Sequence, residues 1–412
     1  MTSTSKTLLI FCDGSGEDGT LTNWNGWPNY TAPQTATNVL RLSRAVRQYT
    51  TSGSNRKQQL VLYMSGVGSE ADFEGNLVGS IQLLTGTAVA SKIRDAYAFL
   101  AQNFEEGDEI CLFGAFHRGA YTVRKLAGLI DRIGLLTREN LGNLFTIWSQ
   151  LVRHQTPTIP ADIRKTRIKC VGVWDTVGAI LNTVDALGIK DTSLPPTVDI
   201  ALHAVSLQDN RDMFLPTLWE TPADGMLISF ATAISISKTT NMMAILQVWF
   251  PGAHSDVGGG YKKQHLSDLA LFWMVGEIKS FIEVDTDLIA KGMHPRVDPW
   301  GTSQPHNAYR LLNPKAKSMV RPMARLHGPH WQIIRDGVFH ESLKHAPADL
   351  EHPEHMITPK CLKDRFGESW EPSYAPLNEF ERHCRDNWDP AIDEASPTVS
   401  FKGLSDLFAS VR

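Results

Sequence analysis

The sequence predicts an α/β fold: a mostly parallel sheet with helices on both faces and a lid-like insertion. Short apolar runs alternate with segments of helical periodicity through the first half of the chain, which is typical of strands joined by crossover helices. Several of these runs stop at a turn containing Gly, Asp or His, as buried parallel strands do. Hydrophobic residues make up 42% of the chain and charged residues 20%, so a sizeable core can form and overall disorder is excluded.

Five apolar runs of strand length are expected to build the sheet. They cover residues 7–12, 60–64, 109–113, 167–174 and 245–250. Apolar residues at helical spacing predict helices over residues 39–46, 88–104, 121–130 and 266–282. Strands separated by helices of this length pair in parallel, which gives the predicted sheet its direction.

Charge and cysteine content exclude several functions. The 40 basic and 44 acidic residues give a net charge of −4 without a long block of either sign, which argues against a nucleic-acid partner. The longest apolar stretch, 226–236, is too short for a spanning helix, so no integral membrane segment is expected. The five cysteines lack metal-binding spacing and indicate reduced thiols. Because no export signal is visible, we expect a cytoplasmic protein.

Three of the expected strands run directly into turns that carry an ionisable side chain. These side chains are His117, Asp175 and His254. Ligands of an open parallel sheet bind beyond the carboxyl ends of its strands, so the three should converge on one crevice. Their order along the chain matches the nucleophile, acid and base of α/β hydrolases. The small residues around His117, between a strand and a helix, are typical of a nucleophile elbow.

Three segments carry a resemblance to a known family. The segments DEICLFGAFHRGAYTVRKLAGLI, VGVWDTVGA and FPGAHSDVGGGY are similar to the catalytic domain of the type VI secretion phospholipase effector family, whose members are α/β hydrolases. The resemblance extends to DGS after the first strand, to LHAVSLQDNRDMFLPTLWE and to the LSDLALFWM helix, and covers at least residues 7–280. It implies an α/β-hydrolase fold, with Asp175 and His254 as the acid and the base of a Ser-Asp-His triad.

The chain departs from the family pattern at the nucleophile. The family has G-F-S-R-G-A where this chain has G-A-F-H-R-G-A, so His117 stands in place of the serine. Without that hydroxyl an ordinary acyl-serine intermediate cannot form. The lipase or esterase activity that the resemblance implies therefore does not carry over directly.

A histidine at the elbow can instead transfer protons. The start of the following helix disfavours imidazolium, so His117 is expected to be neutral near pH 7 and to accept a proton. Pairing with Asp175 is expected to shift His254 the other way, towards its protonated form. Two groups with oppositely shifted pKa values are the pattern of an assigned base and acid.

Further residues are expected to bind an oxyanion or the substrate. Backbone N–H groups at the elbow and in the turn after the first strand can hold an oxyanion. The long segment after the first strand is expected to be a site loop, in which tryptophans either contact substrate or pack the loop. The candidates are Asp13, Gly14, Ser15, Trp24, Trp27 and Arg118.

Three functions stay open, each with a small-molecule partner. In the first, His117, Asp175 and His254 carry out acid–base chemistry, such as cyclisation, isomerisation or elimination, on a small carbonyl-bearing molecule of specialised metabolism. In the second, the chain hydrolyses esters or lipids with an unusual nucleophile, either water or His117 through an acyl-imidazole. In the third, it is a catalytically inactive homologue that binds a ligand. No motif predicts a cofactor or a metal, and none indicates the oligomeric state.

The domain organisation is expected to be one domain with two additions. Residues 1–285 are predicted to form the α/β-hydrolase-like catalytic domain, with an insertion at about 180–244 where prolines break the strand–helix pattern. His203 and Arg211 are expected on a solvent-facing helix of this insertion. Residues 286–412 are expected to be an irregular C-terminal extension packed on the same domain.

Overall fold

One parallel sheet organises the molecule. The computed structural model describes residues 5–14, 35–51, 56–66, 87–115, 118–177, 193–220, 243–292, 296–322 and 334–388. Eight strands of these residues form a sheet in the order β2-β1-β3-β4-β5-β6-β7-β8, with every neighbouring pair parallel. The strands are β1 (Lys6–Cys12), β2 (Gln58–Met64), β3 (Glu109–Gly114), β4 (Ile168–Trp174), β5 (Val198–Ser206), β6 (Ala244–Phe250), β7 (Val338–His340) and β8 (Ser373–Ala375). The predicted α/β fold is confirmed.

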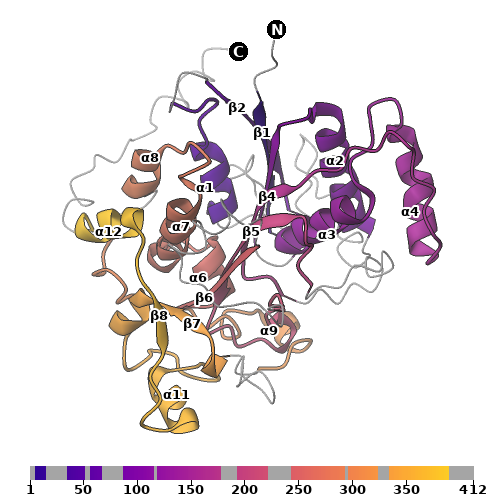
Figure 1. Ribbon diagram of the computed structural model, residues 1–412. Coiled ribbons are helices and arrows are strands. Elements are labelled where there is room, and N and C mark those ends of the chain that lie inside the picture. The colour runs from indigo at the N-terminus through magenta and orange to yellow at the C-terminus, as the bar shows by residue number, and fades with distance from the viewer. Residues whose placement is uncertain are drawn as a thin grey trace, which may run out of the picture.

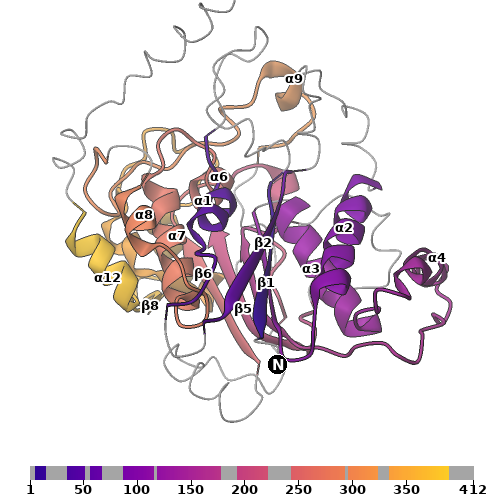
Figure 2. The ribbon, with the colours of Figure 1, turned by 90° about the horizontal axis from the view of Figure 1, so that it is seen from above.

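Helices cover both faces of the sheet, as Figures 1 and 2 show from two directions. One face carries α2 (Thr87–Asn103) and α3 (Arg118–Ile133), with α4 (Leu144–Val152) outside them. The other carries α1 (Asn38–Ala45), α6 (His254–Gly258), α7 (His265–Ile278), α8 (Thr286–Lys291) and α12 (Glu379–Asp386). The short helices α9 (Pro314–Lys317) and α11 (Pro359–Phe366) belong to the later part of the chain.

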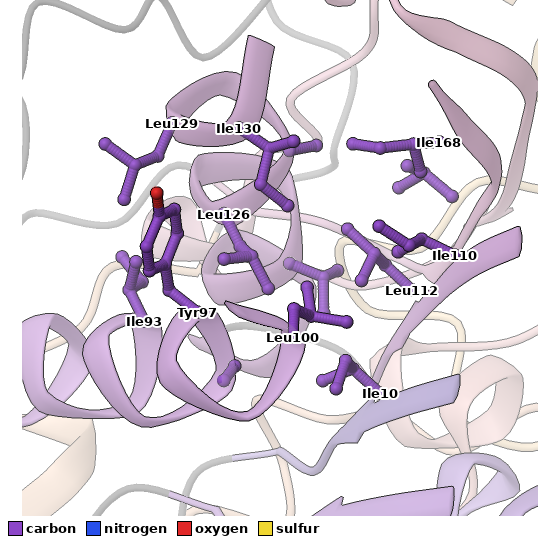
Figure 3. Close-up of a cluster of buried hydrophobic side chains, with 14 of the residues drawn as sticks. Ile10, Ile93, Tyr97, Leu100, Ile110, Leu112, Leu126, Leu129, Ile130 and Ile168 are labelled. Carbon is purple, nitrogen blue, oxygen red and sulfur yellow. The ribbon is translucent and has the colours of Figure 1, made fainter. Parts of the chain in front are cut away.

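The core lies on both sides of the sheet because successive strand residues face opposite ways. In β1, Leu8 and Ile10 pack towards α2 and α3, whereas Leu9 and Phe11 pack towards α1 and α7, and all four are fully buried. Figure 3 shows the first side, where strand residues meet Ile93, Tyr97, Leu100, Leu126, Leu129 and Ile130 of α2 and α3. A strand buried on both faces reads as a continuous apolar run, which explains why β1 could be recognised from the sequence.

The five expected strands are confirmed to within two residues at each end, but the sequence missed three others. The largest omission is β5, which lies between β4 and β6 inside the range treated as an insertion. His203 lies on β5 and is fully buried, so its expected place on a solvent-facing helix is wrong. Arg211 is likewise not helical, because it directly precedes a short 3₁₀ helix at Asp212–Phe214. The rest of the expected insertion, 178–192 and 221–242, lies outside the described residues.

The segment after residue 285 also contributes to the sheet. Strands β7 and β8 extend the edge beyond β6, and α12 packs against α7. Each of these strands has three residues, which is too short for a periodic pattern to be visible in the sequence. The expectation of an irregular segment therefore overlooked the strands that close this side of the sheet.

Two further expectations can be compared with the described residues. All five cysteines are unpaired thiols. No helix in the described ranges has the length and apolar character that crossing a bilayer requires.

Candidate functional site

Asp175 and His254 meet beyond the carboxyl ends of neighbouring strands. Asp175 directly follows β4, and His254 is the first residue of α6, separated from the end of β6 by three residues. The Asp175 Oδ2 and His254 Nδ1 atoms are hydrogen-bonded, and both side chains are buried. An ionised carboxylate can only accept, so Nδ1 carries the proton and Nε2 is the nitrogen left for proton transfer.

Strand β5 holds Asp175 in place. Ser206 donates its backbone N–H to Asp175 Oδ1 at 2.8 Å and its hydroxyl to Oδ2 at 3.1 Å. The Asp175 N–H donates to the carbonyl oxygen of Ala204 at 2.7 Å. Asp175 has a φ of 43°, a left-handed conformation that is unusual for a residue with a side chain. Such a conformation persists where surrounding contacts enforce it, and it is often found at functional sites.

A second set of contacts orients His254 from its other side. Its backbone N–H donates to Asp209 Oδ2 at 3.1 Å, and Asp209 in turn binds Arg211 at 2.6 Å. The ring of Phe214 meets the imidazole edge-to-face, with 4.9 Å between centroids, and the Arg211 guanidinium lies over Phe214 at 3.4 Å. The segment after β5 thus fixes the backbone and one face of the imidazole.

The protonation state of His254 differs from the expectation. Burial lowers the pKa of His254, although Asp175 raises it. The imidazole is consequently neutral near pH 7, rather than shifted towards the protonated form. A neutral imidazole whose Nδ1–H donates a hydrogen bond to a carboxylate can act as a general base through Nε2.

The elbow between β3 and α3 is closely packed. Gly114 ends β3 and Gly119 lies in the first turn of α3. A side chain on Gly114 would overlap the backbone of Ala120, and one on Gly119 would overlap the backbone carbonyl groups that end β1. The small residues around the elbow are therefore required by the close approach of helix and strands. His117 lies between these glycines but outside the described residues.

The other predicted residues are only partly within the described ranges. Arg118 is the first residue of α3, and burial lowers the pKa of its guanidinium. Asp13 accepts hydrogen bonds from Tyr63 Oη at 2.6 Å, from Thr37 Oγ1 at 3.0 Å and from the Gly14 N–H at 2.7 Å. Asp13 therefore ties the end of β1 to β2 and to the start of α1. Ser15, Trp24 and Trp27 lie outside the described residues.

Four residues of this site were not proposed as functional from the sequence. His203, Ser206, Asp209 and Phe214 all belong to β5 or to the segment that follows it. The signal was present, because they lie in the LHAVSLQDNRDMF segment that carries part of the family resemblance. It was overlooked because β5 itself was not recognised.

No metal-binding cluster is evident in the described part of the chain, where three or more His, Cys, Asp or Glu side chains do not gather suitably for one ion.

Comparison with known proteins agrees with the motifs. A family model described as type VI secretion system phospholipase effector Tle1-like, catalytic domain, matches residues 6–277. An uncharacterised protein of Saccharomyces cerevisiae is 29% identical over 238 residues, which make up 52% of this chain and 32% of that protein. The chain thus matches only about a third of the length of this relative.

Two solved structures are similar at low sequence identity. The Tle1 effector bound to the VgrG spike of the type 6 secretion system shares 18% identity with a TM-score of 0.33, over 63% of this chain and 52% of that one. An uncharacterised protein from Pseudomonas aeruginosa shares 16% identity with a TM-score of 0.40, over 93% and 61% of the two chains. The match of the family model over residues 6–277, well over half of the sequence, shows that the chain belongs to the Tle1-like phospholipase effector catalytic domain family.

Proposed function

We propose that this protein is an acid–base enzyme acting on a small carbonyl-bearing molecule, with His254 and Asp175 as its proton-transfer pair. The observation that carries the proposal is the buried hydrogen bond between Asp175 Oδ2 and His254 Nδ1 at the carboxyl ends of the strands. Ligands of parallel sheets bind at this edge. The two side chains come from motifs far apart in the sequence, and β5 fixes the carboxylate that orients the imidazole.

The roles of the pair follow from its contacts. Because Nδ1–H donates to Asp175, the Nε2 lone pair of His254 accepts the proton during the reaction. Asp175 then stabilises the imidazolium that forms. Burial favours the neutral imidazole before the reaction, so the base is in its active form near pH 7.

His117 is proposed as the second acid–base group. Its place in the sequence, between Gly114 and Arg118, corresponds to the family's nucleophile elbow. An imidazole there can protonate or deprotonate a carbonyl compound, and the backbone N–H of Arg118 is the proposed donor to the oxyanion or enolate. The reaction class is then cyclisation, isomerisation or elimination, without an acyl-enzyme.

Hydrolysis of esters or lipids is the second candidate. Membership of a phospholipase effector family favours it. In that case neutral His254 deprotonates a water molecule that attacks the ester carbonyl and displaces the alcohol. Alternatively, His117 attacks directly, the alcohol leaves, and water hydrolyses the resulting acyl-imidazole. Both routes use the same Asp175–His254 pair, so substrates must distinguish the two candidates.

One set of assays with the full chain tests both candidates. p-Nitrophenyl esters of short and medium chain length report hydrolysis, and deuterium exchange at the α-carbon of simple ketones in D₂O reports enolisation. The variants are His117→Ser, His254→Ala and Asp175→Asn. Glu381→Gln is the control, because it changes another buried carboxylate that is paired with a histidine, His340.

The proposed acid–base function predicts ketone exchange that His254→Ala abolishes, no ester hydrolysis by the natural chain, and gain of ester hydrolysis in His117→Ser. Ester hydrolysis by the natural chain that is lost in His254→Ala would establish the second candidate instead. Neither activity in any variant, with intact folding, would contradict both candidates and favour a ligand-binding homologue.

A further inference from the structure

The turn that carries Asp175 rests on a histidine inside the sheet. His203 lies on β5, in register with Val173 of β4 and Gln247 of β6. Its Nε2 accepts the backbone N–H of Thr176, the residue after Asp175, at 3.0 Å. This bond lies directly beside the left-handed residue Asp175. The imidazole is therefore one of the groups that define the conformation of the turn.

The contacts of the two ring nitrogens assign the tautomer of His203. A nitrogen that accepts an N–H must carry a lone pair, so Nε2 is unprotonated. Nδ1 lies 3.3 Å from Gln247 Oε1, which is an acceptor, so Nδ1 carries the proton and donates it. Protonation of both nitrogens would remove the acceptor that Thr176 needs.

The orientation of Gln247 is fixed by a backbone segment. Its Oε1 accepts the N–H of Trp219 at 2.8 Å, and its Nε2 donates to the carbonyl oxygen of Trp219 at 3.0 Å. This pair of bonds determines which end of the amide faces His203. A continuous hydrogen-bonded series thus runs from Trp219 through Gln247 and His203 to the Asp175 turn.

We propose that His203 is a positioning residue for the Asp175–His254 pair, and that it acts as a neutral imidazole whose Nε2 holds the Thr176 N–H. Thr176 is buried, so without this acceptor its N–H would lose a hydrogen bond that water cannot replace. The turn would then relax, and Asp175 would leave the geometry that orients His254. This inference deepens the proposed function and rests on it for its effect on turnover.

The contact also explains why a histidine occurs in the middle of β5, between the apolar residues Leu202 and Ala204. His203 lies on the same face of β5 as Ala201, which packs in the core beneath α3. Trp219 covers the imidazole edge-to-face, with 5.5 Å between centroids. A leucine would fill this space but could not accept the Thr176 N–H, whereas a glutamine could both accept from Thr176 and donate to Gln247.

The first test measures the tautomer and needs no substrate. Two-bond ¹H–¹⁵N correlation spectra of the full chain labelled with ¹⁵N-histidine report which ring nitrogen carries the proton, and the His203→Gln spectrum assigns the His203 signals. We expect protonated Nδ1 and unprotonated Nε2 at pH 7. A proton on Nε2 would overturn the inference.

The second test follows the low-field proton of His254 Nδ1, which reports its hydrogen bond to Asp175. We expect His203→Gln to retain this resonance and His203→Leu to lose it, while far-ultraviolet circular dichroism stays unchanged. An unchanged resonance in His203→Leu would overturn the inference. If His203→Leu does not fold, Gln247→Leu replaces it. This variant removes the acceptor for the His203 Nδ1–H, so we expect the His254 signal to broaden. An unaffected His254 signal would count against the inference.

Turnover provides the third readout and separates the inference from the proposed function. On a substrate found in the exchange or ester assays, His203→Leu should lower kcat by about 10- to 100-fold, the range seen when residues that orient metal-bound histidines are changed, with KM changed less than about twofold. His203→Gln should restore most of kcat. If His254→Ala abolishes turnover but His203→Leu does not reduce it, the inference fails while the function stands. If no variant turns over a substrate, the function fails, and the spectra still decide the inference.

Discussion

Two buried histidine–carboxylate pairs lie at the carboxyl edge of the same sheet and differ in what their ring nitrogens contact. In the pair Asp175–His254, the carboxylate accepts a hydrogen bond from His254 Nδ1. In the second pair, Glu381 Oε1 lies 2.7 Å from His340 Nε2, and the Ser342 hydroxyl lies 2.7 Å from Nδ1. The second imidazole therefore uses both nitrogens for contacts within the fold, which leaves neither for proton transfer.

The two carboxylates also differ, in their backbone conformation and in the groups that hold them. Asp175 lies in a left-handed turn and is held by donors of β5. Glu381 lies in the first turn of α12, where its Oε2 accepts the N–H of the capping residue Asn378 at 2.8 Å. His340 also stacks on Phe250, with 4.4 Å between centroids. The second pair therefore joins α12 to the end of β7, whereas backbone strain and precise orientation mark the first pair as a candidate for chemistry.

The largest expected difference between the pairs is in turnover. Asp175→Asn should lower kcat by about 10³- to 10⁴-fold, because an amide neither stabilises imidazolium nor holds the required tautomer. Glu381→Gln should leave kcat within about twofold. The measurement is steady-state kinetics on the substrate that the exchange or ester assays identify. Equal losses in both variants would remove the functional distinction between the pairs.

The free energy of unfolding should show the reverse order, with the larger loss in the pair Glu381–His340. His340→Ala leaves the buried Glu381 carboxylate without the donor at its Oε1, and loss of one partner of a buried pair costs about 3–5 kcal/mol. Asp175→Asn should cost about 1 kcal/mol, because the amide oxygen still accepts from Ser206. Urea unfolding followed by tryptophan fluorescence measures both. A larger loss in Asp175→Asn would mean that the first pair is the main structural contact.

A smaller difference is expected when a side chain is added to a glycine near each pair. A side chain on Gly119 would overlap backbone atoms of Cys12 and Asp13, whereas the atoms nearest to one on Gly276 belong to the side chain of Asn378. Both alanine variants should lose about 1–3 kcal/mol of unfolding free energy. Only Gly119→Ala should also lower kcat, because backbone at the elbow must move. Gly142→Ala is the control, since a Cβ there meets nothing within 4 Å. Unchanged kcat in Gly119→Ala would contradict this assignment.

The smallest expected difference is in pH dependence. Burial lowers the pKa of His254 below its ordinary value of 6.5, so the unfolded chain binds more protons than the folded one just below pH 6.5. This contribution to stability is complete above pH 6.5 and is lost as pH falls towards the folded pKa. His254→Gln should flatten that slope in unfolding experiments between pH 5 and 7.

The region of the second pair should respond in the opposite direction. Burial raises the pKa of Glu277, which accepts a hydrogen bond from Asn378 at 3.0 Å. Folding thus favours the protonated form of Glu277, and the contribution of this group to stability falls as pH rises above the ordinary glutamate pKa of 4.5. Glu277→Gln should reduce this fall. Identical slopes in His254→Gln and Glu277→Gln would show that the regions do not differ in proton linkage.

Much of the fold could be predicted because central parallel strands are continuous apolar runs. Strands β1, β3, β4 and β6 follow this pattern. The pattern fails for β5, where Asp199, His203 and Ser206 interrupt the run, since contacts with neighbouring strands and with the Asp175 turn decide those positions. It also fails for β7 and β8, because three residues define no period.

The site was predictable to the extent that a motif follows a strand. Asp175 and His254 were found in this way, and their contact places them together as the sequence suggested. The expected direction of the His254 pKa shift was wrong, because the depth of burial depends on residues far away in the chain, such as Phe214. The supporting residues of β5 were missed because polar residues in a central strand resemble a surface pattern until the partner turn is known.

The order of the strands has a consequence for how the chain is made. Every strand from β2 to β8 joins the sheet beside the strand synthesised before it, except β3, which pairs with β1 on the side opposite β2. A nascent chain can therefore add strands at one growing edge as it leaves the ribosome. After β6 has emerged, its edge stays open through the synthesis of α6 to α9 until β7 arrives. An open apolar edge invites pairing with other chains, so this interval is where a translational pause would do most harm and where a chaperone would be most useful.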